Sequence, residues 1–274
     1  MKEINPMMIS ILTPSYNQGR YIERNILSVL NQHYPSFEHI IIDGGSTDNT
    51  VEILQKYPHL KWVSEKDNGQ ADALNKGLEI ATGEIIGWIN SDDFYEPDVL
   101  NDVAKEFEDV NIQWIVGNIK MFYEESKRAI PMRSPTITHS SLLKDPDIVK
   151  QQATFFRKTI LQQLGGWNST LQMIMDYDLW LRLARISTPK MIDKWWANFT
   201  HQAEQKSHGR NNLEQLHEML GVMKREGAPR WCFLKVSYKK YLYSFKFHIK
   251  SRLISMGLIS SKYLHLNLIN RNGT

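Results

Sequence analysis

The stretch Gly83-Glu84-Ile85-Ile86-Gly87-Trp88-Ile89-Asn90-Ser91-Asp92-Asp93 decides the fold. Its apolar part, from Ile85 to Ile89, has the length and branching of a buried strand. Two adjacent carboxylates, Asp92 and Asp93, follow directly, at the end of the strand where open α/β sheets bind their ligands. Like charges held this close are costly unless a cation lies between them, and hard oxygen ligands suit Mg²⁺ or Mn²⁺. The stretch therefore predicts either a metal-binding strand end or, since Asp favours turns, an exposed turn.

Three similar units precede this stretch. Apolar strands are expected over residues 8–12, 39–42 and 60–64, and helices over residues 21–32, from about 51 to 54, and over 71–81. This repeated alternation predicts a parallel sheet with right-handed crossovers. Polar clusters at residues 13–17, 43–48 and 90–93 all follow strands, so we expect them to gather along one edge of the sheet as a single cleft.

The pattern changes after Pro97. Helices are expected over residues 98–108, 176–186 and 212–226, with a short one ending at 164. Strands are expected over residues 114–117, 119–123 and 151–156, with an extended segment at 196–201 and an irregular region at 131–146.

Composition limits the class of protein. The 274 residues are 42% hydrophobic and 11% aromatic, which is a core-forming composition. The single Cys232 excludes an internal disulfide and fits a reducing compartment. Residues 1–6 lack the long apolar core of a signal peptide, so none is expected, and the given sequence has no run of about 18 apolar residues. We therefore expect a cytoplasmic protein that is soluble or, at most, bound to the inner face of a membrane.

Charge is unevenly distributed along the chain. Residues 227–274 hold nine of the 33 basic residues and none of the 30 acidic ones. This contrast predicts a main domain over residues 1–226 and a basic, aromatic, helical tail over 227–274. The segment 230–254 fits an interfacial helix on anionic lipid, and it also fits a helix packed back on the body. Nucleic acid is disfavoured as a partner because the acidic body would repel a phosphate backbone.

Four motifs, in this order, resemble those of family 2 glycosyltransferases of the GT-A fold: Ser10–Asn17, Ile42–Asp48, Asp67–Gly77 and Asn90–Asp93. The resemblance extends from about Met8 to Ser207. It implies an α/β fold with a Rossmann-like, mostly parallel sheet flanked by helices, followed here by a C-terminal helical extension. It also implies a metal-dependent, inverting glycosyltransferase of hexosyltransferase type. Such an enzyme moves a sugar from a nucleotide diphosphate sugar, with UDP favoured, to a hydroxyl of a glycan or lipid-linked glycan in cell-surface polysaccharide synthesis.

The resemblance also assigns roles to individual residues. Asp176 matches the catalytic base, and a divalent ion, Mn²⁺ or Mg²⁺, is expected on Asp92, Asp93 and His201. Tyr16 is expected near the base of the nucleotide, and Asp43 is expected to accept a hydrogen bond from the base ring. The expected nucleotide-sugar-binding residues are Thr13, Pro14, Tyr16, Asn17, Asp43, Asp72, Asn75, Lys76, Asn90 and Asp92.

Elementary chemistry supports these roles. A diphosphate leaving group develops negative charge, which a metal ion can neutralise. The acceptor hydroxyl loses its proton as it attacks, so a carboxylate must lie near it. Asp176 begins a helix, whose dipole favours the ionised form. Asp178, two residues later, is the alternative candidate for the catalytic base.

Two departures from the family pattern leave alternatives open. Asn90 stands where many members have the first Asp of the metal motif, and Met175 stands where an acid often precedes the base. A nucleotidyltransferase would release pyrophosphate and usually carries a Gly-rich basic loop near the first strand. A non-catalytic nucleotide-sugar-binding protein would bind the donor without turnover.

Overall fold

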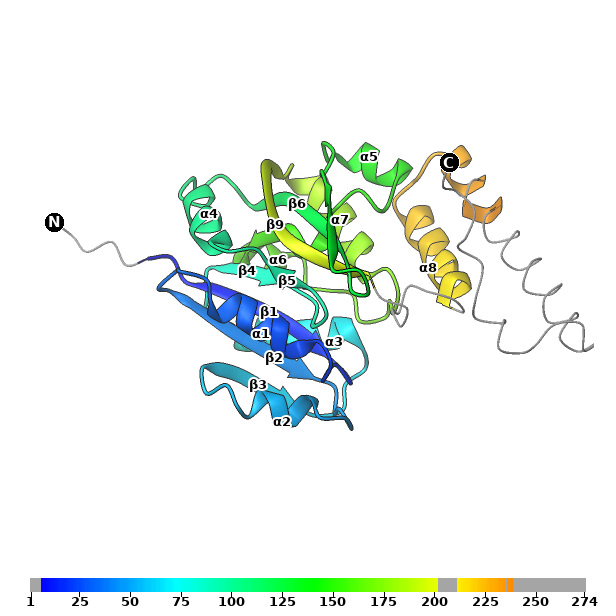
Figure 1. The fold of residues 1–274 in the computed structure, drawn as a ribbon. Helices are drawn as coiled ribbons and strands as arrows, with labels where there is room; N and C mark the ends of the chain where they lie inside the picture. Colours follow the sequence, from blue (N-terminus) through cyan, green and yellow to red (C-terminus); the bar gives the residue numbers. More distant parts are fainter. Residues whose placement is uncertain (1–5, 202–210, 235, 239–274) are drawn as a thin grey trace, which may run out of the picture. The chain divides into compact units, whose positions relative to one another are not determined.

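The computed structural model describes residues 6–201, 211–234 and 236–238 (Figure 1). The chain divides into two compact units, Met1–Gln202 and Ala203–Thr274. This division precedes the helix α8 (Asn211–Arg225), which therefore belongs to the second unit. The sequence pattern instead suggested a boundary after residue 226, where the charge changes.

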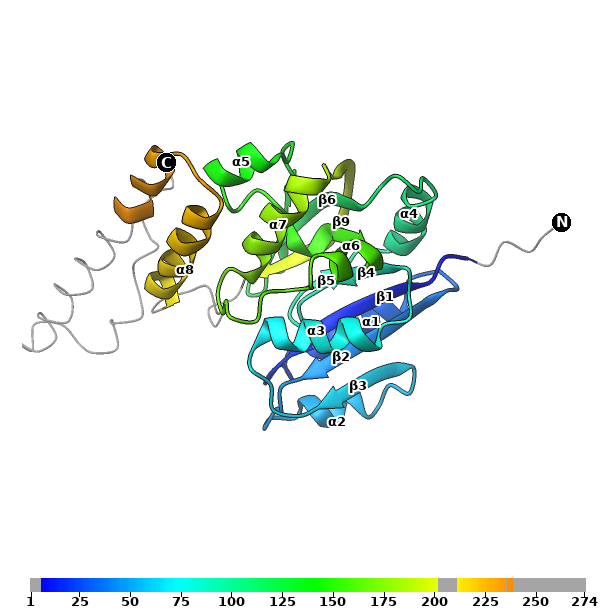
Figure 2. The same cartoon turned by 180° about the vertical axis from the view of Figure 1, so that it is seen from behind.

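The first unit begins with alternating strands and helices, as the sequence predicts. The elements are β1 (Ile9–Ser15), α1 (Ile22–Leu30), β2 (Phe37–Asp43), α2 (Thr50–Leu54), β3 (Leu60–Ser64), α3 (Gln70–Ile80) and β4 (Ile85–Trp88). The pairs β1–β2, β2–β3 and β1–β4 are all parallel. Helices cover both faces of these strands, since α1 lies in front of β1 and β2 in Figure 1 and α3 lies in front in Figure 2.

The rest of the first unit extends the sheet with short strands. It contains β5 (Phe94–Tyr95), α4 (Val99–Glu106), β6 (Trp114–Tyr123), β7 (Arg128–Met132), α5 (His139–Lys144), the 3₁₀ turn η1 (Gln151–Ala153), β8 (Thr154–Arg157), α6 (Lys158–Gln163), α7 (Met175–Ile186) and β9 (Lys190–His201). Within the described residues the sheet has the order β3-β2-β1-β4-β8-β6-β9-β5, and β7 pairs with β6.

The expected α/β fold is confirmed, but parallel pairing does not extend through the whole sheet. Strand β8 is antiparallel to both β4 and β6, and β9 is parallel to β6 but antiparallel to β5. Two local predictions were wrong. The region 131–146, expected to be irregular, contains the end of β7 and helix α5, and residues 151–153 form a 3₁₀ turn rather than the start of a strand.

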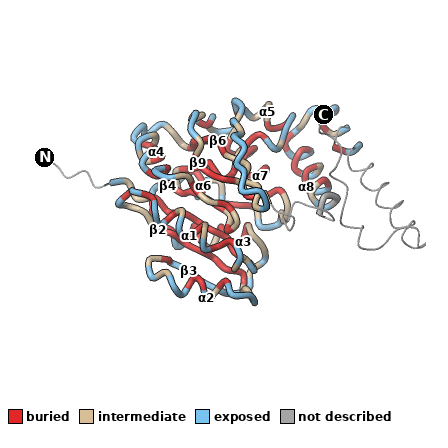
Figure 3. The backbone as a smooth tube through the Cα atoms, in the orientation of Figure 1, coloured by how far each residue is buried: buried red, intermediate tan, exposed pale blue. Residues whose placement is uncertain are grey.

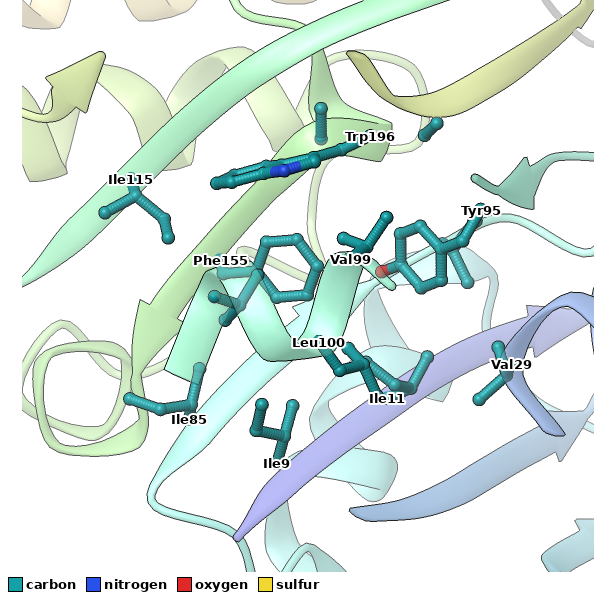
Figure 4. Packing of buried hydrophobic residues seen from close by; sticks show 14 of the residues in the cluster. Ile9, Ile11, Val29, Ile85, Tyr95, Val99, Leu100, Ile115, Phe155 and Trp196 are labelled. Atoms are coloured by element: carbon teal, nitrogen blue, oxygen red, sulfur yellow. The ribbon is translucent and has the colours of Figure 1, made fainter. Parts of the chain in front are cut away.

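Strand β1 is buried along its whole length, and Figure 3 shows that buried backbone is concentrated in the strands. Its side chains alternate between the two faces of the sheet. Ile9 and Ile11 pack with Val29 of α1, Phe155 and Trp196 in one core cluster (Figure 4). This packing fixes β1 at the centre of the parallel strands.

Strand β1 is also longer than the sequence suggested, because it continues through Thr13 and Pro14 to Ser15. Proline lacks the backbone N–H that a strand between two partners would donate. Strand β4 pairs with β1 only as far as Leu12, so β1 is an edge on that side when it reaches Pro14. The strand can therefore extend into the expected loop.

Adjacent residues Glu38 and His39 of β2 place two titratable groups in the interior. Burial raises the pKa of Glu38, but hydrogen bonds from Lys61, Ser10 and Thr82 outweigh it and lower the pKa to about 2. Burial, reinforced by nearby His59, lowers the pKa of His39 to about 3. The ring Nε2 of His39 lies 2.9 Å from the Thr13 hydroxyl. The folded protein therefore holds His39 neutral.

We predict that acid destabilises the protein through His39 before it does so through Glu38. The pKa of His39 in the folded state lies below its unfolded value, so its stabilising contribution is complete above pH 6.5 and is lost as the pH falls toward 3. Between pH 6.5 and 4.5, the free energy of unfolding should fall by about 2 kcal/mol on account of this residue.

Urea denaturation at several pH values measures the slope of the free energy of unfolding against pH. The variant His39→Gln can still contact Thr13 but does not titrate, so its slope in this window should be smaller than that of the wild type. Equal slopes for the two proteins would contradict the assignment. Glu38 does not interfere, because its contribution is lost only below about pH 4.5.

Candidate functional site

The loops that follow β1 and β2 carry predicted site residues, and both loops begin at the same edge of the sheet. Strand β1 ends at Ser15, which lies opposite Asp43 at the end of β2, and Asp43 lies opposite Ser64 at the end of β3. On the other side of β1, Trp88 at the end of β4 lies opposite Leu12. The register therefore brings together the segments that follow these four parallel strands, including the three polar clusters that the sequence places at one edge.

The loops after β1 and β2 are joined by Asn17. Its backbone N–H donates to the Ser46 hydroxyl at 2.7 Å, and its side-chain oxygen accepts from the Thr47 N–H at 2.8 Å. Asn17 adopts a left-handed backbone conformation (φ 52°), which Asn tolerates better than most residues. Next to this bridge, Tyr16 exposes 59% of its surface. The joined loops therefore present an aromatic ring on a fixed backbone.

Asp43 is fully buried beneath these loops. One carboxylate oxygen accepts from the Ser46 hydroxyl at 2.5 Å, and the other accepts from the Ser46 N–H at 2.9 Å and the Ser64 hydroxyl at 2.7 Å. A carboxylate has about four acceptor positions. The three bonds occupy most of these positions and hold Asp43 in place.

Thr13 takes a different place from the one expected. It is buried within β1, and its hydroxyl contacts His39 rather than the loop surface. Pro14 is likewise part of the strand. Thr13 and Pro14 therefore belong to the strand that precedes the loop, and the loop itself begins at Tyr16.

The expected residues of α3 are mostly engaged in fixing the backbone. Asp72 accepts from the Asn68 N–H at 3.0 Å, and Lys76 pairs with Glu65 at 2.8 Å, which raises the pKa of Lys76. Asn75 donates to the Trp167 carbonyl at 2.7 Å and accepts from the Trp167 N–H at 2.9 Å. Asn75 thus fastens the turn between α6 and α7 to α3.

Glycine is required at the turn that Asn75 holds. Gly166 has a left-handed φ of 71°, and a Cβ there would lie 2.3 Å from the Asn75 side-chain oxygen. A few residues later, Gln172 donates to the Asn68 carbonyl at 3.1 Å. The segment that leads into α7 is therefore tied twice to α3 and to the residues just before it, near the edge where β3 ends.

Asp176 and Asp178 lie in the first turn of α7 but have different surroundings. Asp178 is fully buried and pairs with Arg182 at 2.7 Å, and Arg182 donates to the carbonyls of Leu164 and Gly166. Asp176 is only partly buried, and one of its oxygens accepts from the Tyr177 N–H at 2.7 Å. Asp178 therefore has a structural partner, and Asp176 is the more accessible of the two carboxylates. Met175, where an acid was noted as missing, is buried.

A cluster of aromatic side chains packs α7 against the sheet. Trp180 stacks on Trp114 (centroids 6.1 Å apart), on Phe156 (5.7 Å) and on Trp88 (6.5 Å). Trp167 meets Trp88 edge-on at 5.6 Å. Because Trp88 ends β4, this packing fixes the helix that carries Asp176 relative to the turn that carries Asp92.

Asn90 is the centre of an amide network. Its side-chain oxygen accepts from Gln70 at 2.7 Å and from the Trp88 indole at 3.0 Å, and its amide nitrogen donates to Gln151 at 3.2 Å. Gln151 in turn donates to the Trp88 carbonyl at 2.7 Å. Gln70 lies within the motif Asp67–Gly77, but nothing in the sequence pattern indicates its contact with Asn90.

The two acids of the metal motif face different surroundings. Asp93 is 1% exposed, and its oxygens accept from the Thr200 N–H at 2.7 Å and from Gln152 at 3.0 Å. Burial, together with the charge of Asp92, raises the pKa of Asp93 well above its usual value. This orientation argues against the expected role of Asp93 as a metal ligand. Asp92 is only partly buried.

The remaining donors suit a cation shared with a substrate. No group of three or more His, Cys, Asp or Glu side chains within the described ranges could hold a metal ion alone. Mg²⁺ is usually bound by one or two carboxylates together with substrate phosphates, rather than by a cage of protein ligands. Asp92 fits this pattern. His201 ends β9, where its ring lies 5.2 Å from that of Tyr123.

Comparison with known proteins agrees with this geometry. Residues 10–167 match the family model described as glycosyl transferase family 2. Chondroitin synthase of Escherichia coli is 28% identical over 243 residues, which cover 86% of this chain and 34% of the synthase. The chain thus spans about a third of the length of this curated relative.

Two solved structures share the fold. Staphylococcus aureus TarS 1–349 in complex with UDP-GlcNAc has a TM-score of 0.64 and 22% identity, covering 80% of this chain and 66% of that one. The mannosyltransferase PcManGT from Pyrobaculum calidifontis, in complex with GDP-Man and Mn²⁺, has a TM-score of 0.62 and 19% identity, covering 87% of this chain and 70% of that one.

The amide network makes Asn90→Asp a destabilising change. The introduced carboxylate oxygen would face the Gln151 oxygen that now accepts from Asn90, and Gln151 cannot rotate without losing its bond to Trp88. We expect a loss of about 1–3 kcal/mol in the free energy of unfolding, measured with urea at pH 7.

Asn168→Asp is the matched control. The Asn168 side-chain oxygen accepts from Thr170, and a carboxylate can do the same. This variant should stay within about 0.5 kcal/mol of the wild type. Equal stability of the two variants would show that the network around Asn90 has no preference for an amide.

Proposed function

Because the chain belongs to glycosyl transferase family 2, we propose that it is a metal-dependent, inverting glycosyltransferase. In this proposal it moves a sugar from a nucleotide diphosphate sugar to a hydroxyl of a glycan or lipid-linked glycan during cell-surface polysaccharide synthesis. The similarity to chondroitin synthase supports a polysaccharide product. The structures of TarS with UDP-GlcNAc and PcManGT with GDP-Man show that proteins of this fold bind such donors.

One structural observation supports the proposal: the segments that carry three chemically distinct groups begin at, or are tied beside, one edge of the sheet. Tyr16 and Asp43 lie at the ends of β1 and β2, and Asp92 follows β4. The segment that leads to Asp176 is tied to Asn68 and Asn75 beside that edge. A base, a diphosphate and an acceptor hydroxyl need contacts of these three kinds.

The nucleotide is proposed to be UDP. Tyr16 offers an exposed face on which a base can stack. Asp43 is proposed to accept a hydrogen bond from the ring N–H of uracil, which requires the loop around Ser46 to move because Asp43 is fully buried in this structure. Asn17 and the Asp72, Asn75 and Lys76 segment are proposed to surround the nucleotide and sugar.

In the proposed transfer reaction, Asp92 and Asp176 have different roles. A divalent ion, when bound to Asp92 and His201, would neutralise charge on the leaving diphosphate. Asp176 would accept the proton of the acceptor hydroxyl as that oxygen attacks the anomeric carbon. The bond from this carbon to the diphosphate breaks in the same displacement, so the configuration inverts and no enzyme nucleophile is needed.

Asp176→Asn tests the proposed base. Transfer from a UDP-sugar to a glycan acceptor should fall about 100- to 10,000-fold, while UDP binding, measured by calorimetry, stays within about twofold. Asp178→Asn is the matched variant, because it changes the neighbouring acid that pairs with Arg182. It should lower stability yet retain transfer per folded molecule.

The same assay separates the alternatives. If Asp178→Asn loses transfer and Asp176→Asn does not, the base assignment is wrong. Release of pyrophosphate rather than UDP would indicate a nucleotidyltransferase. Binding of UDP-sugars without turnover over a broad acceptor panel would indicate a non-catalytic binder.

The C-terminal unit is proposed to contact an anionic membrane surface at the inner face of the membrane. Residues 230–234 and 236–238 are helical, with Cys232 and Val236 buried. Trp231, Leu234 and Tyr238 are 50%, 70% and 63% exposed, and their spacing places them on one helical face. Residues 227–274 carry nine basic and no acidic side chains, which complements anionic lipid. Within the described residues, no helix is long and apolar enough to span a membrane.

Replacement of Trp231, Leu234 and Tyr238 by Ser tests this surface. Binding to vesicles of phosphatidylserine and phosphatidylcholine should weaken by about tenfold or more, and it should also weaken with salt. A control with Val110, Ile130 and Ile186, also exposed, changed to Ser should bind as the wild type does. Unchanged vesicle binding with lowered stability would instead show that this face is covered by protein.

A further inference from the structure

Two segments from distant parts of the sequence are joined beside the proposed metal site. The Thr200 N–H donates to the Asp93 carboxylate at 2.7 Å, and the Thr200 hydroxyl donates to the Asp92 carbonyl at 2.5 Å. Asp93 and Thr200 are both buried. Each is the immediate neighbour of a proposed metal ligand, since Asp92 precedes Asp93 and His201 follows Thr200.

The join continues the pairing of two strands. Strands β5 and β9 are antiparallel, with Phe94 opposite Asn198 and Tyr95 opposite Ala197. Extending this register by two residues brings Asp92 opposite Thr200. The side chains of Thr200 and Asp93 thus supply hydrogen bonds where the backbone ladder ends.

Arg24 of α1 completes the join. One guanidinium nitrogen donates to the Asp92 carbonyl at 3.2 Å and to the Thr200 hydroxyl at 3.1 Å. The other pairs with Glu124 at 2.7 Å. The guanidinium carbon also lies 4.5 Å from the ring centre of Phe94 and 5.0 Å from that of Phe122. These contacts fix the orientation of Arg24.

Hydrogen bonds from side chains of other elements also hold the rest of the turn Asn90–Asp93. Asn25, also in α1, donates to the carbonyls of Asn90 and Asp93, each at 3.0 Å. Gln152 of η1 donates to the second Asp93 oxygen. The backbone that carries Asp92 is therefore bound by side chains from α1, η1 and β9.

We propose that Asp93, Thr200 and Arg24 are positioning residues that fix the separation between Asp92 and His201. They do so by binding the two backbone segments to each other before any cation arrives. In this arrangement the buried acid of the pair is an anchor, and Asp92 alone faces the cation. The inference rests on the proposed function, because it presupposes that Asp92 and His201 hold a divalent ion together with the diphosphate.

The test measures how strongly Mn²⁺ increases the affinity for UDP. Calorimetry with the full chain gives UDP affinity in EDTA and in a series of Mn²⁺ concentrations. Thr200→Val should weaken the Mn²⁺ effect about 10- to 100-fold and leave UDP affinity in EDTA within about twofold. Thr200→Ser keeps the hydroxyl and should restore the effect. A merely structural role of Thr200 would lower UDP affinity equally with and without metal.

Arg24→Lys and two acid variants provide independent readings. Arg24 is partly exposed, so its replacement is compatible with folding, and a single ammonium cannot reproduce the two-point contact of the guanidinium. Arg24→Lys should therefore also weaken the Mn²⁺ effect. Asp93→Asn should retain most of it, because the Gln152 amide can rotate to accept from the introduced amide. Asp92→Asn should abolish it.

The outcomes separate this inference from the proposed function. If wild-type protein binds UDP with no dependence on Mn²⁺, both are overturned. If the wild type shows the dependence and both Thr200→Val and Arg24→Lys retain it, only the positioning role is overturned. If Asp93→Asn loses as much as Asp92→Asn, Asp93 is a ligand rather than an anchor.

Discussion

The parallel register of β2, β1 and β4 is the constraint on which the site depends. Because Ser15 ends β1 opposite Asp43, the two loops that follow begin side by side and can be joined through Asn17. Because β4 pairs with β1 only to Leu12, the chain after Trp88 turns away early enough to meet α1 and β9. A shift of one residue in either pair would move every side chain to the opposite face of the sheet.

At two places in the structure, one of two nearby acids is buried and the other is partly accessible. Asp93 and Asp178 are buried and hold backbone or a partner side chain, whereas Asp92 and Asp176 remain partly accessible. A buried carboxylate with hydrogen-bond partners is costly to move, so each anchor fixes the backbone of its accessible neighbour. Preorganisation of this kind removes an ordering cost that substrate binding would otherwise bear.

The sequence predicted most elements of the sheet because their apolar runs follow from burial on both faces. It failed at β7, whose residues are mostly exposed and which, among the described strands, pairs with β6 alone, so no hydrophobic pattern identifies it. Asp43 ends β2, Asp92 follows β4 and Asp176 lies in the first turn of α7, close to the places that the sequence pattern predicts. The sequence could not find Arg24, Gln152 or Thr200, because their partners lie far away in the sequence; Arg24 and Thr200 are 176 positions apart.

The surroundings of Asn90 and Met175 suit the residues that this chain has at the two positions. An amide at position 90 has an acceptor in Gln151 and donors in Gln70 and Trp88, and Met175 is buried where an acid would lack water. Asn90 and Asp93 are both engaged in hydrogen bonds, and Asp92 is less buried than Asp93. A single carboxylate holds a hard cation weakly, so under the proposed function the phosphate oxygens of the donor would complete the coordination shell. The proposed function therefore implies that metal and donor bind together at this turn.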